Sequence, residues 1–180
     1  MTKVQLVRVG ILPAGTLDAI TRAIQHELGW DARLLPEMGD PEGAYDARRG
    51  QYNSTLLLHL LEDSFDTRSG PVLGVAHVDL FIPILTFVFG EAMLGGPAAV
   101  VSVHRLRPEF YGLPPDPDLL NQRLATEAIH ELGHTCGLTH CTDYTCAMHA
   151  SHSADEIDIK GPGLCLPCLH RLRSGTAAQQ

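Results

Sequence analysis

Three histidines and one glutamate lie within eleven residues, at spacings typical of a catalytic zinc site. His130 and His134 are four residues apart, so on a helix their imidazoles lie on the same face. Glu131 follows the first histidine, where its carboxylate could reach a water on the metal without binding the metal itself. Gly137 would let the chain leave the helix through a left-handed turn and bring back His140 as a third ligand. Three protein ligands leave a position for water, so the pattern predicts a metal-dependent hydrolase, although HExxH alone also occurs by chance in helices that bind nothing.

Four of the five cysteines form two close pairs with the spacing of a second metal site. Cys141 and Cys146 flank four residues, and Cys165 and Cys168 form a CxxC motif after an eighteen-residue gap. Four thiolates can surround one tetrahedral zinc at about 2.3 Å and leave no place for water, which is typical of a structural site. Two disulfides or buried free thiols are the alternative, but the start of the chain shows no secretory leader pattern. Cys136, the fifth cysteine, is expected to be a small buried apolar residue.

The segments that must position these residues alternate between strand-like and helical patterns. Continuous or alternating apolar runs predict strands over residues 4–12, 32–35, 72–81, 85–89 and 98–106. Helical spacing predicts one helix over residues 17–28, stopped by Gly29, and another from a cap at residue 53 or 54 to about residue 64. Asp116 as a cap, with Pro117 at the first helical position, predicts the start of the zinc-bearing helix. This order predicts a mixed α/β fold with a sheet packed by two long helices.

Two segments lack these regular patterns. Residues 37–53 are rich in Gly, Asp, Glu and Arg, which predicts a loop. Residues 138–180 have few long apolar runs and carry four of the five cysteines, so a metal would supply the free energy that burial cannot. We therefore predict one catalytic domain with two parts. Residues 1–137 form an N-terminal subdomain that ends in the HExxH helix, and residues 138–180 form a small, irregular, zinc-stapled subdomain.

Composition and charge exclude several classes of protein. A hydrophobic content of 44% is ordinary for a globular domain, and no run of about eighteen apolar residues predicts a transmembrane helix. The net charge of −8 argues against binding to phosphate backbones. Only 6% of the residues are aromatic, which disfavours a zinc-ribbon protein that binds nucleic acid. We expect a cytoplasmic, monomeric protein without nucleic-acid or membrane partners.

The motifs over residues 130–168 resemble those of the archaemetzincins, one branch of the metzincin zinc peptidases. In that family a cysteine follows the third histidine directly, as Cys141 follows His140 here. A methionine comes two positions after the second cysteine, as Met148 comes after Cys146 here. The resemblance implies a metzincin-like fold with a mixed, twisted β-sheet and two long helices.

The resemblance also implies a role for each matching residue. The catalytic zinc would be held by His130, His134 and His140. A second, structural zinc would be held by Cys141, Cys146, Cys165 and Cys168. Met148 would form the Met-turn, a bend that places its thioether beneath the catalytic zinc without binding it. The upper strand of the family would fall near residues 85–90, where a substrate backbone could pair with its edge.

The implied activity is that of a zinc peptidase with two zinc ions per chain and peptide or protein substrates. Zinc would lower the pKa of its bound water to about 7. Glu131 would take a proton as this water attacks a peptide carbonyl and would then pass it to the leaving amine. The alternative is a non-catalytic zinc protein that binds peptides or a partner through the same cleft. The presence of Glu131 favours the enzyme, because binding alone requires no base there.

Other polar residues near the motif have less specific patterns. Glu127 and Arg123 lie one and two turns before His130 and could orient the ligands, but an i,i+4 ion pair between them is the simpler interpretation. His149 and His152 are expected to be solvated. No role is assigned to His77, Asp79 and His104, and core packing is expected for Phe87 and Phe89.

Overall fold

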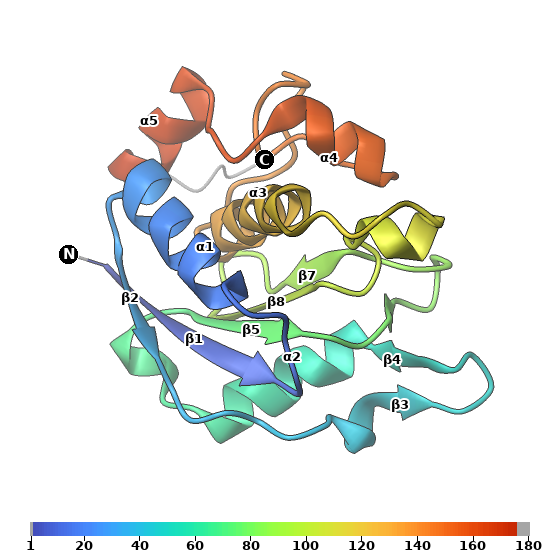
Figure 1. Ribbon diagram of the computed structural model, residues 1–180. Coiled ribbons are helices and arrows are strands. Elements are labelled where there is room, and N and C mark those ends of the chain that lie inside the picture. The colour runs from blue at the N-terminus through green and yellow to red at the C-terminus, as the bar shows by residue number, and fades with distance from the viewer. Residues whose placement is uncertain (1, 176–180) are drawn as a thin grey trace.

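The computed structural model describes residues 2–175, and a twisted five-stranded sheet forms its centre (Figure 1). Its strands are β1 (Lys3–Val9), β2 (Asp31–Leu34), β5 (Val72–Ala76), β7 (Gly90–Ala92) and β8 (Ala98–Ser102). They lie in the order β2-β1-β5-β8-β7; the first four are parallel, and β7 pairs antiparallel with β8 at one edge. The mixed α/β fold predicted from the sequence is therefore confirmed.

Helices cover both faces of this sheet, which explains why every residue of β5 and of β8 is buried and why these strands are apolar runs. The helices beside the sheet are α1 (Thr16–Ala23), which continues as a π-helical turn over Ile24–Leu28, α2 (Ser54–Ser64) and α3 (Pro117–Thr135). Helices α1 and α3 lie on one face, and α2 lies on the other (Figure 1). No helix within residues 2–175 is both long enough and apolar enough to cross a membrane.

The starts of the long helices follow from their capping residues. Asn53 accepts a hydrogen bond from the Leu56 N–H (3.2 Å), and α2 begins at the next residue. Asp116 accepts one from the Leu119 N–H (3.0 Å), and α3 begins at the proline that follows. Gly29, at φ 67°, ends the first helical segment. Both predicted starts and the predicted stop are confirmed.

Two predicted strands are shorter than their apolar runs. Strand β1 ends before Gly10, at φ 72°, rather than at residue 12. The strand predicted over residues 98–106 ends at Ser102, whose hydroxyl accepts a hydrogen bond from the His104 N–H (3.0 Å) and so turns the chain. Local turn chemistry, which hydrophobic periodicity does not report, sets both ends.

A second, small sheet contains β3 (Tyr45–Asp46), β4 (Gln51–Asn53) and β6 (Leu80–Phe81). Strand β6 is the end of the apolar run 72–81, which divides into two strands. The loop predicted over residues 37–53 is wrong, because it contains a 3-10 turn at Glu42–Ala44 and the hairpin of β3 and β4. These strands have two and three residues, too few for an alternating pattern to show.

The strand predicted over residues 85–89 is also wrong. Within the described residues this segment makes one isolated β-bridge, between Leu80 and Val88, and the edge strand β7 begins only at Gly90. Most of the segment from Ile82 to Phe89 instead lines a cleft, together with residues of α3.

The segment after residue 137 contains α4 (Ala154–Lys160) and α5 (Leu166–Ser174), where the sequence predicted an irregular fold. Its own core is small and rich in sulfur: Leu138, Cys146, Met148 and Cys168. Helix α4 adds Ile157 to the main core beside α3. The division of the chain into subdomains at residue 137 stays a prediction.

Candidate metal centres and active-site cleft

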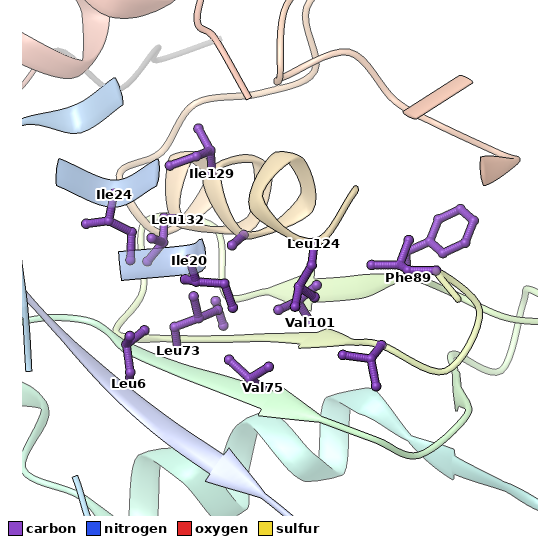
Figure 2. Close-up of a cluster of buried hydrophobic side chains, with 14 of the residues drawn as sticks. Leu6, Ile20, Ile24, Leu73, Val75, Phe89, Val101, Leu124, Ile129 and Leu132 are labelled. Carbon is purple, nitrogen blue, oxygen red and sulfur yellow. The ribbon is translucent and has the colours of Figure 1, made fainter. Parts of the chain in front are cut away.

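The last turns of α3 carry the catalytic motif into the interior, where His130 is 6% and Glu131 is 4% exposed. Leu132 lies between the two histidines in sequence and packs into the core between α3 and the sheet (Figure 2). Residues two positions apart point to opposite sides of a helix. Burial of Leu132 therefore turns His130 and His134 away from the sheet and toward the C-terminal segment.

Helix α3 ends at Thr135, and Gly137 follows two residues later with φ 81°, where the sequence predicts a left-handed turn. The Gly137 N–H donates to the His134 carbonyl (2.8 Å), and the Leu138 N–H donates to the Gly133 carbonyl (3.0 Å). These two bonds form a Schellman motif, which requires the left-handed conformation that glycine adopts at low cost. The turn brings His140 back toward the helix.

The three predicted histidine ligands have nitrogen atoms within 4.8 Å of one another. The Nε2 atoms of His130 and His134 are 3.0 Å apart, close to the edge of about 3.3 Å that a tetrahedral zinc site requires. The Nδ1 atoms of the same residues hydrogen-bond to the carbonyls of Ala147 and Leu138, both at 2.7 Å. A carbonyl only accepts, so each Nδ1 carries the proton and each Nε2 is free to bind metal. The arrangement fits a zinc ion.

Burial sets the protonation states in this group. It lowers the pKa of His130 well below the usual histidine value and lowers the pKa of the other two histidines, which keeps them neutral and able to bind metal. Burial also raises the pKa of Glu131 well above its usual range; the carboxylates of Glu127 and Glu91 raise it further, and Lys160 opposes them. A carboxylate with a raised pKa is a better proton acceptor.

Two glycines leave room for the catalytic side chains. A Cβ at Gly90 would lie 2.6 Å from a carboxylate oxygen of Glu131 and 2.6 Å from the Val100 carbonyl, so β7 can lie against Glu131 only without a side chain there. A Cβ at Gly133 would overlap the sulfur of Met148, which is fully buried against α3. Neither contact was predicted, because a glycine in a strand or helix gives only a weak signal.

The four predicted cysteine ligands come together in the C-terminal segment. Their sulfur atoms lie within 4.8 Å of one another, and none of the cysteines in the described chain is in a disulfide. Cys141 and Cys165 have sulfurs 3.8 Å apart, which matches the edge of about 3.8 Å of a tetrahedron with zinc–sulfur bonds of about 2.3 Å. Backbone N–H groups of Asp143 and Cys165 lie 3.4 and 3.3 Å from the sulfurs of Cys141 and Cys146, where they would stabilise thiolates. This set fits a closed zinc site.

A cleft of about 580 Å³ opens over the three histidines. Glu131, Thr139, Ala150 and His152 line this cleft. Apolar side chains also line it and are called its apolar wall: Ile82, Leu85, Phe87, Phe89 and Leu94. Phe89 is buried in the main core, and Phe87 is partly buried and packs against the same core, so the predicted core packing is confirmed for both; both rings also line the cleft.

The hairpin of β3 and β4 holds this wall in place. Arg49 donates through Nη2 to the carbonyls of Leu85 (2.7 Å) and Thr86 (3.0 Å), and its guanidinium stacks 4.0 Å from the ring of Phe81. Gln51 donates to the Thr86 carbonyl as well (3.0 Å). The segment predicted to be a loop therefore fixes one side of the cleft.

A second support of the wall involves Asp79, to which the sequence assigned no role. Arg105 donates two hydrogen bonds to the Asp79 carboxylate, at 2.6 and 2.7 Å, and lies 4.3 Å over the ring of Phe87. Burial tends to raise the pKa of Asp79, but the bonds from Arg105 and Gln51 outweigh this and hold the pKa below its usual value. Asp79 thus fixes the position of Arg105, which in turn packs over Phe87 in the wall of the cleft.

The predicted ion pair between Arg123 and Glu127 is wrong. Arg123 makes two hydrogen bonds to Asp158 of α4, at 2.7 and 2.6 Å, and Glu127 forms an ion pair with Lys160 at 3.0 Å. Both side chains reach across to α4 because α3 is covered there. Both side chains therefore pair with residues more than thirty positions away in sequence instead of with each other.

Three minor predictions have mixed outcomes. His152 has a side chain that is 85% exposed, as predicted, but His149 is partly buried and hydrogen-bonds through Nδ1 to the Cys141 carbonyl (2.8 Å). Cys136 is only half-buried and lies outside both groups of candidate ligands; burial raises the pKa of its thiol.

Comparison with known proteins places these sites in a family context. Peptidase family M54 matches residues 33–174. An archaemetzincin of Methanocaldococcus jannaschii is 43% identical over 94% of this chain and 95% of its own. The crystal structure of an archaemetzincin from Methanopyrus kandleri aligns over 98% of this chain and 96% of that one, with 38% identity and a TM-score of 0.86. The structure of a zinc-dependent peptidase from Methanocorpusculum labreanum aligns over 94% of this chain and 99% of that one, with 29% identity and a TM-score of 0.86.

Proposed function

Since the chain belongs to peptidase family M54, the archaemetzincins, and is a zinc metallopeptidase, we propose that it cleaves peptide bonds with Glu131 as the general base. The proposed ligands of the catalytic zinc are His130, His134 and His140. The observation that carries this proposal is the placement of a buried carboxylate beside three clustered histidines, two of which, His130 and His134, have Nε2 free to bind metal.

The residues of the cleft suggest how the reaction proceeds. When bound, zinc supplies a water of lowered pKa and a Lewis acid for the carbonyl oxygen. Glu131, the buried carboxylate beside the histidines, accepts a proton from the attacking water and returns it to the leaving amine. Strand β7 is the edge of the large sheet, so a substrate backbone can add to it beside Glu131.

We further propose a second, structural zinc on the four cysteines, which gives two zinc ions per chain. The sulfur atoms have the spacing of a tetrahedral site, and all four come from the segment that has little apolar core of its own. A binding protein without catalysis is disfavoured, because binding alone does not account for a buried carboxylate at position 131.

The test is a comparison of the zinc-loaded wild type with Glu131→Gln on a diverse peptide mixture, read by mass spectrometry. We expect the variant to keep its zinc content and to lose activity by about 10²- to 10⁴-fold, the contribution typical of a general base. Full activity in the variant would contradict the role of Glu131. No cleavage by the zinc-loaded wild type would favour the binding-protein alternative.

A further inference from the structure

Lys160, the last residue of α4, has a side chain with no exposed surface. Its Nζ lies 3.0 Å from Oε1 of Glu127 and donates to the carbonyls of Ala147 (3.1 Å) and His149 (2.8 Å). The lysine ammonium therefore makes two hydrogen bonds to backbone carbonyls and one ion pair with a carboxylate. A buried charge is costly unless it is paired and hydrogen-bonded in this way.

The three acceptors lie on the two elements that form the catalytic centre. Glu127 stands one turn before His130 on α3, and the Ala147 and His149 carbonyls flank Met148. The Ala147 carbonyl also accepts the hydrogen bond from Nδ1 of His130 (2.7 Å). One carbonyl oxygen is thus shared by the buried lysine and a candidate zinc ligand.

We propose that Lys160 is a positioning residue that fixes the Ala147 carbonyl and thereby orients His130 for zinc. The inference rests on the proposed function only in taking the three histidines as zinc ligands. The partner that holds the second nitrogen of a metal-bound histidine sets the direction of the ring, and its loss typically lowers metal affinity about 10- to 100-fold. Lys160 does not contact His130 itself; it donates to the Ala147 carbonyl, which in turn accepts the hydrogen bond from Nδ1 of His130.

The chain offers a comparison in Arg123 and Asp158, which form a second ion pair between α3 and α4, with Arg123 buried and Asp158 partly exposed. Arg123 also donates to the Leu106 carbonyl (3.0 Å), far from the Met-turn in sequence. Removal of either pair takes away one α3–α4 contact, but only removal of Lys160 frees the Ala147 carbonyl. A purely structural role predicts equal effects of the two removals on zinc binding.

The experiment measures zinc release from the full protein under rising chelator for Lys160→Met/Glu127→Leu and for Arg123→Met/Asp158→Leu. Zinc released from the histidines is recognised as the stage of release that His130→Ala lacks. We expect the first double variant to bind this zinc about 10- to 100-fold more weakly, with release from the cysteines unchanged, and the second to bind it as the wild type does.

A second variant keeps the test decisive where the double variant does not fold. Lys160→Gln retains two amide donors, so its loss of affinity should be smaller than that of Lys160→Met. Unchanged zinc affinity in the lysine variants, or an equal loss in the arginine control, would overturn the proposal. Zinc affinity is measured without peptide hydrolysis, so an inactive wild type would overturn the proposed function and leave this result standing.

Discussion

Two of the three histidines lie on α3, whose opposite face is buried in the main core, and the third follows the turn at its end. The cysteine group instead joins chain segments that share a small, sulfur-rich core. In the first group, the fold is in place and presents ligands to a metal. In the second, the small core includes all four cysteines that are the candidate metal ligands. Under the proposed function, a metal on the histidines would bind to a site that the fold has already formed, whereas a metal on the cysteines would stabilise the segment that contains them. Each change below acts on one of these two groups.

The largest effect is expected from Cys165→Ser/Cys168→Ser. Structural zinc contributes an apparent free energy of about 10–16 kcal/mol in small domains, so its loss should unfold the segment after residue 137 and displace His140. We expect activity below detection and rapid proteolysis within that segment, while the sheet resists cleavage. Cys136→Ser is the control, since Cys136 lies outside both groups, and it should behave as the wild type. A double variant that stays active would refute the stapling role.

Gly90→Ala tests the catalytic group, where we expect the packing of the fold, and not a bound metal, to fix the position of Glu131. The new Cβ would overlap Glu131 and the Val100 carbonyl, and displacement of a catalytic group by about 1 Å can cost about 100-fold in rate. We expect kcat to fall on this scale with the zinc content unchanged. Gly39→Ala, where a Cβ meets nothing within 4 Å, should leave kcat unaltered. Equal activity of the two variants would contradict the close approach of β7 to Glu131.

Gly133→Ala tests the packing of α3 on the Met-turn. Its Cβ would overlap the sulfur of Met148, and overpacking of a core typically costs about 1–3 kcal/mol. Chemical denaturation should show this loss in the free energy of unfolding. The further change Met148→Ala should recover part of it by making room. No recovery in the double variant would mean that the two residues do not meet as described.

The smallest effect is expected from Arg49→Met, which removes the hydrogen bonds that hold the cleft wall. Hydrogen bonds from charged groups contribute about 1.5–3 kcal/mol each when buried and less here, because Arg49 is partly exposed. We expect KM for peptides to rise several-fold with kcat and zinc content nearly unchanged. Arg48→Met, in the same turn and exposed, is the control. A fall in kcat alone would assign Arg49 to the chemistry instead of the wall.

Much of the geometry of the candidate metal sites could be predicted because it depends on local spacing. The i,i+4 histidines share a helix face, Gly137 supplies the turn that returns His140, and Asp116 marks the helix start. These relations hold within one or two turns of chain, where sequence distance and spatial distance agree. The buried runs of β5 and β8 were visible for the same reason.

The supports of the site could not be predicted because they join distant positions. Arg49 reaches Leu85, and Glu127 reaches Lys160, across more than thirty residues in each case. A lone arginine or lysine has no periodic pattern that distinguishes a buried anchor from a solvated surface residue. The short hairpin strands fail for a related reason, since two or three residues cannot show an alternation.

Hydrogen exchange of the protein with and without zinc tests the contrast between the two metal groups most directly. The account predicts that metal removal abolishes the protection of amides after residue 137, while β1, β5, β8 and the first half of α3 keep theirs. Stepwise chelation should release the histidine zinc with little change in exchange, and loss of protection should accompany release from the cysteines. Uniform loss of protection across the sheet, or no loss after residue 137, would contradict the account.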